Sequence, residues 1–449
     1  MRTIVAGVVL VLSAASAAAL GACGPERSHG GDDDDGTKMD ACVGLECQVV
    51  NCQAMGMPDT SVSGTIFAPN GTLPLYGINV YVPREDPGPL TEGVTCDQCA
   101  NGFPGSPIVQ TKTDEMGHFS LAGIPAGDNI KLVVTQGKWR RIVSLPTVAQ
   151  CTDTAVDPTM TRLPKNKSEG DIPKIAITTG SADSLECLVL RLGIDPAEVT
   201  TSGKGGRVHL YHGNGTGQIG NDPMSDATAL WNSVDTMKPY DIAIFSCESA
   251  QHPETKSQDA MNAVKAYADL GGRVFLSHWH NIWVGGPFQG GGDGQLPQVW
   301  NTIATWSRND DQFNNPDLID EAGNPNGTAF ATWMMNVMGS TMRDKIDILA
   351  TTGKNTCLTV DNSKAERWVY LNPSNGGAER PQNFQFTTPN EADPANRCGK
   401  VVFSDMHVSG GPGGGSYPGS CGQTTTLSAQ EKALAFMFFD IASCVGVIF

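Results

Sequence analysis

Residues 263–280, AVKAYADLGGRVFLSHWH, decide the fold of the larger part of this chain. The first part of this stretch has apolar side chains at helical spacing, and Gly271 and Gly272 then end the helix. The run from Arg273 to Ser277 follows at once and has an apolar centre, which is typical of a buried strand. A helix that leads directly into a buried strand is the repeating unit of an α/β domain.

Four further runs are predicted to be strands of the same sheet: 174–178, 208–211, 241–246 and 400–405. Capping-box spacing predicts helices that begin at Asp183–Glu186 and at Ser428–Glu431, and the second extends to Ile441. Residues 281–398 are rich in Gly, Asn and Pro and are predicted to be a long insertion. The sequence therefore predicts a three-layer α/β domain over residues 171–449, with a mainly parallel sheet.

Residues 58–165 have the pattern of an all-β domain. Apolar and polar residues alternate in short runs such as 62–67 and 78–82, and turns with Gly and Pro separate them. This pattern predicts a β-sandwich, and the polar segment 163–171 separates it from the α/β domain. The predicted fold class is multidomain: an N-terminal all-β sandwich plus a C-terminal three-layer α/β domain.

Residues 1–22 have the pattern of a bacterial lipoprotein signal peptide, with Arg2, an apolar run to Leu20 and then Cys23. Cys23 is the predicted lipidation site, and its acyl chains would anchor the protein to a membrane of the cell envelope. Residues 23–57 are predicted to be a Cys-rich acidic tether. The net charge of −17 argues against nucleic acid as a partner. We expect a lipid-anchored protein at the periplasmic or outer-membrane surface.

The chain has 13 cysteines, and the even number left after Cys23 favours disulfides in an exported protein. Cys96 and Cys99 form a C-x-x-C motif, but no second motif or nearby His pair completes a zinc set, so these two are also predicted to be structural. Cys187 follows the first strand and Cys247 follows the third. Because these strands are expected to be neighbours, Cys187–Cys247 is a candidate disulfide.

The segments SGTIFAPNGTLPLYGINVYV (63–82) and TDEMGHFSLAGIPAGDNIKLVV (113–134) resemble the carboxypeptidase regulatory-like, or transthyretin-like, β-sandwich. The resemblance covers most of residues 58–145. It implies a non-catalytic spacer or a binding module.

The segments YDIAIFSCES (240–249), 263–280 and GKVVFSDMH (399–407) resemble the class I glutamine-amidotransferase-like superfamily, most closely its trehalose-utilisation-protein-like branch. The resemblance implies a nucleophilic Cys in a Gly-rich elbow and a late His-Pro-Glu. This chain has Ser277-His278-Trp279 at the first place and Met406-His407-Val408 at the second. We therefore expect no glutamine amidotransferase activity.

Reactive side chains gather at the carboxyl ends of the predicted strands, where open parallel sheets bind their ligands. His278 and His280 are two residues apart, as are Asp405 and His407, so alternation would place each pair on one face. These four residues are the candidate ligands of zinc or a similar divalent transition metal. Such a metal could activate water for hydrolysis.

A second hypothesis gives the site a nucleophile. Cys247 or Ser277 would attack, with His407 or His278 as the base, and all four are candidate catalytic residues. A Cys187–Cys247 disulfide would remove the thiolate that this hypothesis needs.

A third hypothesis is a ligand-binding surface. Trp279 and Trp283 could offer aromatic faces to a glycan, and His212 ends the second strand at the same edge. The Gly-rich loop after His212 leads into no helix, so it is not a predicted phosphate-binding loop. The leading interpretation is a lipid-anchored surface binding module, with a metal-dependent hydrolase as the alternative.

Overall fold

The computed structural model describes residues 44–288, 299–300, 302–308, 316–348, 354–372, 378–408, 415–422 and 426–446. All of them belong to one compact unit, Val43–Phe449. The predicted signal peptide, Cys23 and most of the tether lie outside the described residues. The described end of the tether forms two short 3-10 helices, η1 (Leu45–Gln48) and η2 (Gln53–Met55). Within the described residues, no helix has both the length and the hydropathy that crossing a bilayer requires.

The N-terminal part is an all-β sandwich, as the alternating pattern predicted. One sheet has the order β4-β1-β7 and the other β3-β2-β5-β6. In β4 every second residue is buried, which is the pattern of a strand with one face on a core. The strands are β1 (Ser61–Thr65), β2 (Asn79–Pro83), β3 (Pro107–Lys112), β4 (His118–Ala122), β5 (Gly127–Gln136), β6 (Trp139–Val148) and β7 (Asp153–Ala155).

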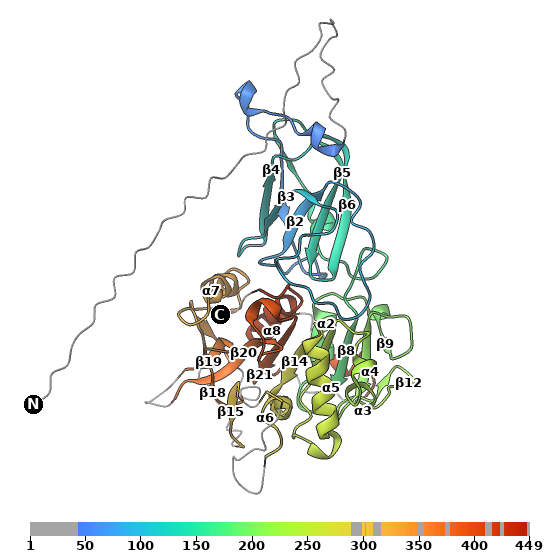
Figure 1. Cartoon of the computed structure of the whole chain (residues 1–449), viewed down its shortest axis with the longest axis vertical. Helices are drawn as coiled ribbons and strands as arrows, with labels where there is room; N and C mark the ends of the chain where they lie inside the picture. Colours follow the sequence, from blue (N-terminus) through green and yellow to red (C-terminus); the bar gives the residue numbers. More distant parts are fainter. Residues whose placement is uncertain are drawn as a thin grey trace, which may run out of the picture. The chain divides into compact units, whose positions relative to one another are not determined.

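The C-terminal part is built on a sheet with the order β17-β16-β19-β20-β21-β14-β13-β8-β10-β9 (Figure 1). The strands from β21 to β9 are parallel, and they are β8 (Ile175–Thr179), β9 (Val199–Thr201), β10 (Val208–His212), β13 (Ile242–Phe245), β14 (Arg273–Ser277) and β21 (Gly399–Ser404). The helices of the described residues are α1 (Pro158–Thr161), α2 (Leu185–Arg191), α3 (Thr228–Trp231), α4 (Val234–Met237), α5 (Gln258–Asp269), α6 (Ile282–Gly285), α7 (Gly327–Asn336) and α8 (Ala429–Ile441).

Residues 281–398 extend this sheet. Strand β20 pairs antiparallel with β21, and β19, β16 and β17 continue outward from it in antiparallel order. These strands are β16 (Asp317–Ile319), β17 (Lys345–Ile346), β19 (Glu366–Leu371) and β20 (Arg380–Thr388). A separate two-stranded sheet joins β15 (Ala304–Trp306) to β18 (Cys357–Val360), and β11 (Gln218–Ile219) pairs with β12 (Asp222–Pro223). The region between β14 and β21 is therefore partly a continuation of the main sheet.

The helices cover both faces of the sheet, which gives the predicted three layers. Buried residues of α2 and α8 share one core with the sandwich, and those of α3, α5 and α6 form the other. Trp139 of the sandwich contacts Phe438 and Phe439 of α8, with ring centroids 6.2 and 5.9 Å apart. In the polar segment between the two parts, Arg162 pairs with Glu169 at 2.5 Å. The sandwich thus packs directly on the α/β part.

Four disulfides join described cysteines: Cys52–Cys151, Cys96–Cys398, Cys99–Cys444 and Cys187–Cys421. The two cysteines of the C-x-x-C motif pair with distant partners, so their predicted structural role is confirmed. The predicted Cys187–Cys247 disulfide is wrong. Cys187 pairs with Cys421 of the 3-10 helix η8 (Gly419–Cys421), and Cys247 is a buried free thiol. Several disulfides in one chain fit an extracytoplasmic protein.

The predicted end of α5 and the predicted bounds of α8 hold, but α2 does not start as predicted. Ser428 and Glu431 form a complete capping box at the start of α8. Gly271 ends α5 with φ of +115°, and a Cβ there would meet the carbonyl oxygen of Thr95. At α2 the N-cap is Ser184, and its side chain makes no capping bond. The carboxylate of Asp183 is used elsewhere, in the site described next.

Candidate functional site

Three adjacent strands bring one thiol and two imidazoles together at the carboxyl edge of the sheet. Cys247 lies two residues after β13, His278 directly follows β14, and His407 lies three residues after β21. One ligand atom from each lies within 4.8 Å of the other two. The Cys247 Sγ is 3.3 Å from the Nδ1 of His278, and the ring centroids of His278 and His407 are 4.9 Å apart. We call these three residues the Cys–His–His cluster.

The backbone at His278 is strained. His278 has φ of +47°, a left-handed conformation that few residues other than glycine adopt. It stands at a sharp change from strand β14 to the 3-10 helix η5 (His278–Asn281). Strain of this kind persists only where the surrounding structure enforces it, and it is common at functional sites. Beyond this turn the Nδ1 of His278 lies beside the Sγ of Cys247.

Asp183 connects the two histidine-bearing segments. Its Oδ2 accepts a hydrogen bond of 2.6 Å from the Ser277 hydroxyl, and its Oδ1 accepts one of 2.9 Å from the backbone N–H of Val408. Ser277 directly precedes His278, and Val408 directly follows His407. One buried carboxylate therefore fixes the backbone on both sides of the cluster. Ser277 belongs to this frame, since its hydroxyl proton is directed at Asp183.

Asp405 has a similar role at the next strand. Its two oxygens accept bonds from the Thr356 N–H, the Thr356 hydroxyl and the Cys357 N–H, all between 2.7 and 3.1 Å. These contacts join the start of β18 to the segment that leads to His407. The carboxylate therefore binds the start of β18, and the group of ligand atoms that lie within 4.8 Å of one another does not include Asp405.

The cluster is buried and its surroundings are acidic. The exposed fractions of Cys247, His278 and His407 are 0%, 1% and 2%. Burial lowers the pKa of His407 well below its usual value, so this imidazole is neutral. Burial raises the pKa of Asp183 to about 7 and also raises that of Asp405, and both carboxyl groups interact electrostatically with His278.

His280 is not part of the cluster, so the prediction that it shares a metal with His278 is wrong. Its Nε2 contacts the carbonyl of Ser246 at 2.9 Å, and its Nδ1 accepts a hydrogen bond of 2.8 Å from the Trp283 indole. The prediction assumed that the strand continues past residue 277. Strand β14 ends at Ser277 instead, and in the 3-10 helix that follows residues two apart point in different directions.

The predicted ligand-binding residues are dispersed. Trp283 is fully buried against Trp231 and Phe245, so its prediction as an exposed sugar platform is wrong. Trp279 is half-buried and contacts the rings of His278 and Phe288. His212 ends β10, and β8 and β13 separate β10 from β14.

Cys247 lies at the carboxyl edge of the sheet, as predicted, but it was predicted to be a nucleophile or part of a disulfide. The order of the strands indicates that Cys247, His278 and His407 belong to one site. Strands β13, β14 and β21 are consecutive in the sheet, so residues that follow them are brought together. His407 Nε2 has no hydrogen-bond partner among the described residues, as expected of an atom that could coordinate an ion.

The donor set decides which metals fit. One thiolate sulfur and two imidazole nitrogens suit zinc and copper, whereas magnesium and calcium prefer oxygen ligands. In a tetrahedral zinc site, with Zn–S of about 2.3 Å and Zn–N of about 2.0 Å, the donors lie about 3.5 Å apart. The contact of 3.3 Å between Cys247 and His278 is close to that spacing.

Comparison with known proteins adds little to this description. No family model and no curated protein matches the chain. A solved ThuA-like protein from Bacteroides uniformis is 12% identical over 52% of this chain and 82% of its own, with a TM-score of 0.28. A cohesin–X–dockerin complex from Acetivibrio cellulolyticus is 16% identical over 33% of this chain and 88% of its own, with a TM-score of 0.17. The fold assignment rests on the strand order and register given above.

Proposed function

We propose that the α/β part is a metal-binding domain, with Cys247, His278 and His407 as ligands of a divalent transition metal, most simply zinc. The observation that carries the proposal is the convergence of one sulfur and two imidazoles from three adjacent strands within 4.8 Å. The buried carboxyl groups of Asp183 and Asp405 are compatible with it, because both interact electrostatically with His278.

The contacts around the ligands also support metal binding. Metal-binding histidines are usually held by an outer shell of hydrogen bonds, and that shell affects affinity strongly. Here Asp183 holds the residue before His278 and the residue after His407. A pre-arranged set of ligands costs less ordering entropy when the ion binds.

The proposal is for metal binding and does not extend to hydrolysis. A hydrolytic metal needs a coordination position that water and substrate can reach. In the described structure each of the three ligand side chains is at most 2% exposed. This burial favours an ion enclosed by protein over one that faces a substrate.

The test is the metal content of the purified, disulfide-bonded protein after loading with zinc or cobalt and removal of the excess. We expect about one ion per chain and, with cobalt, the near-ultraviolet charge-transfer band of a thiolate ligand. Cys247→Ser and His407→Gln should each lower retention at least tenfold. The matched control is Cys357→Ser, since Cys357 is the other buried free thiol of the described residues and is not in the cluster.

Two results would contradict the proposal: a wild-type protein that retains no zinc or cobalt, or a Cys247→Ser variant that retains as much as the Cys357→Ser control. A variant that does not fold would be recognised by the loss of its near-ultraviolet circular dichroism. His407→Gln then provides an independent reading, because it leaves both thiols in place.

We also propose that the protein is exported and acylated at Cys23, which would place the metal-binding domain in the cell envelope. The lipoprotein-like sequence of residues 1–23 and the oxidised cysteines support this location. Mass spectrometry of the N-terminal peptide from membranes should show a diacylglyceryl Cys23. A Cys23→Ser variant should leave the membrane fraction, and a wild-type protein without acyl groups would refute this assignment.

A further inference from the structure

A cavity of about 330 Å³ lies at the other end of strand β21 from the Cys–His–His cluster. Lys400, near the start of β21, lines this cavity, whereas His407 follows the end of the strand. Sandwich residues such as Asn79 and Gln136 form another wall, and helix α8 forms a third. A volume of this size is within the usual range of small-molecule sites.

One wall of the cavity is aromatic. The Tyr76 ring stacks on Phe436 with an angle of 11° between the planes and 6.1 Å between the centroids. Trp368 meets the same Phe436 ring edge-on at 5.6 Å. Phe436 and Trp368 are buried, and Tyr76 is half-buried. The Tyr76 ring, backed by Phe436, therefore offers an apolar surface that suits a ligand with a C–H face and polar edges.

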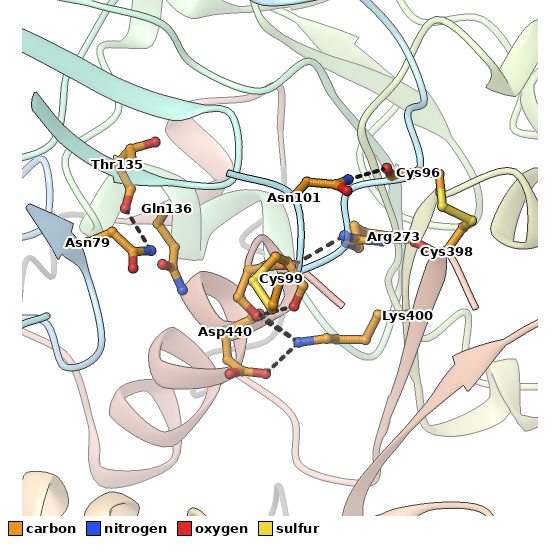
Figure 2. Close-up of a disulfide and its surroundings, with 12 residues drawn as sticks. Asn79, Cys96, Cys99, Asn101, Thr135, Gln136, Arg273, Cys398, Lys400 and Asp440 are labelled. Atoms are coloured by element: carbon orange, nitrogen blue, oxygen red, sulfur yellow. Dashed lines mark hydrogen bonds and ion pairs between the residues drawn. A yellow bond between two sulfur atoms is a disulfide. The ribbon is translucent and has the colours of Figure 1, made fainter. Parts of the chain in front are cut away.

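The cavity is also lined by polar side chains, and hydrogen bonds hold these side chains in position. The Lys400 ammonium donates to Asp440 at 3.1 Å and to the Ser443 hydroxyl at 2.8 Å. The buried Glu366 carboxylate accepts a bond of 2.7 Å from the Gln385 amide. Figure 2 shows Lys400 and Asp440 beside the Cys99 disulfide, with sandwich residues of the same cavity nearby. Polar groups fixed in this way give a ligand its orientation.

The charges of the described lining residues balance. Two cations, Lys112 and Lys400, are matched by two anions, Glu366 and Asp440. A strongly charged ligand would meet repulsion from one pair and would disturb the Lys400–Asp440 contact. A neutral ligand with several hydroxyl groups can instead donate to the carboxylates and accept from the amides.

Disulfides hold the walls of the cavity together. Cys99 and Cys444 both line it and are bonded to each other, which joins a sandwich loop to the segment after α8. Cys96 of the same loop is bonded to Cys398, just before β21. A cavity fixed by covalent bonds loses little freedom when a ligand enters.

We propose that this cavity binds a neutral sugar, with the ring face of the sugar against Tyr76 and its hydroxyls bonded to Glu366 and Asp440. The proposal is independent of the metal-binding proposal, because the two sites share no residue. It also differs from the sequence-based hypothesis of a glycan surface at Trp279 and Trp283, which lie outside this cavity.

The test uses the disulfide-bonded protein and isothermal titration calorimetry with glucose, N-acetylglucosamine, cellobiose and chitobiose as probes. We expect at least one probe to bind with a dissociation constant of about 1 mM or tighter. Tyr76→Ala and Glu366→Gln should each weaken that binding at least tenfold. The matched control is Tyr370→Ala, which removes a half-buried ring that does not line the cavity and should leave the affinity unchanged.

Absence of binding by all four sugars at about 10 mM would overturn the proposal. So would equal affinity for wild type and for both cavity variants, since the sugar would then bind elsewhere. If Tyr76→Ala does not fold, Glu366→Gln still decides the question, because glutamine keeps the shape and an acceptor for Gln385. Loss of metal through Cys247→Ser should leave sugar binding unchanged.

Discussion

Each cysteine of the C-x-x-C motif forms a disulfide with a distant cysteine. Removing these two disulfides, singly and together, should lower the free energy of unfolding by amounts that follow from the loops they close. Cys96 is bonded to Cys398 and Cys99 to Cys444, with sequence separations of 302 and 345 residues. Both bonds start from the loop between β2 and β3 of the sandwich. While one of the two bonds is intact, the other closes a loop made of residues 96–99, the intact bond and residues 398–444. This loop has only about 50 residues.

The chain-entropy relation then gives the expected magnitudes. Closing about 50 residues restricts the unfolded chain by about 4 kcal/mol at 25 °C. When both bonds are absent, the shortest remaining connection runs through Cys187–Cys421 and spans about 110 residues. Loss of the second bond should therefore cost about 5 kcal/mol, which is more than loss of the first. Cys96→Ala with Cys398→Ala should cost about as much as Cys99→Ala with Cys444→Ala.

The assay is urea unfolding of the oxidised proteins, followed by tryptophan fluorescence and by circular dichroism, with paired Cys→Ala variants to leave no unmatched thiol. The control is the Cys357→Ser variant, which removes a free thiol and no bond. A single-pair variant that loses less than about 1 kcal/mol would contradict these magnitudes, as would a double-pair variant that is no less stable than the single-pair variants.

Three further predictions concern other parts of the chain. Asp183→Asn should lower zinc affinity about 10- to 100-fold, because an amide has one acceptor oxygen where Asp183 uses two, for the Ser277 hydroxyl and the Val408 N–H. Asp226→Asn at an exposed turn should leave the affinity unchanged, and competition with a chelating dye measures both. The Arg162 pair holds the pKa of Glu169 at about 2, below its ordinary 4.5, so the pair stabilises the fold above pH 4.5 and the effect is lost as the pH falls toward 2. Glu169→Gln should therefore lower stability by about 1 kcal/mol at pH 7, and urea midpoints of the two proteins should converge in acid. Trp283→Ala should cost about 3–5 kcal/mol in thermal unfolding and Trp279→Ala clearly less, since only Trp283 is fully buried.

The core strands and the helices α5 and α8 could be predicted well, because the patterns that indicate them are local in the sequence. Strand β14 has the predicted bounds, since an amphipathic helix and two glycines fix its start. The start of α8 is also as predicted, because its capping box uses only residues of its own first turn. The start of α2, by contrast, depends on contacts that are distant in the sequence. The same spacing occurs there, but Asp183 is diverted to Ser277 and Val408, which lie 94 and 225 residues away.

The pairing of cysteines could not be predicted, because it depends on where a loop returns. Cys421 reaches Cys187 from a segment 234 residues later in the chain, and no local pattern announces that approach. The proposed partner, Cys247, lies instead next to His278. Likewise, nothing in the composition of residues 281–398 indicates that β16 pairs with β19, since Asp317 and its partner Leu371 lie far apart in the sequence.

The candidate site was partly predictable for a clear reason. The rule that ligands bind at the carboxyl edge of a parallel sheet correctly brought Cys247, His278 and His407 to one edge. The alternation rule then failed at both histidine pairs. Strands β14 and β21 end at Ser277 and Ser404, so His280 and Asp405 lie beyond the region where residues two apart share a face.

The two buried free thiols of the described residues allow a direct comparison that bears on the metal proposal. Cys357 contacts the carbonyl of Thr359, and burial raises its pKa well above the usual value, as expected of a cysteine that serves as a small apolar side chain. Cys247 is equally buried but faces two imidazoles, one of them held by a strained backbone. Packing explains the first thiol and leaves the strain at His278 unexplained. A bound metal would explain both the strain at His278 and the free thiol of Cys247. Substitution of Cys247 should therefore lower zinc retention and substitution of Cys357 should not, although both thiols are buried.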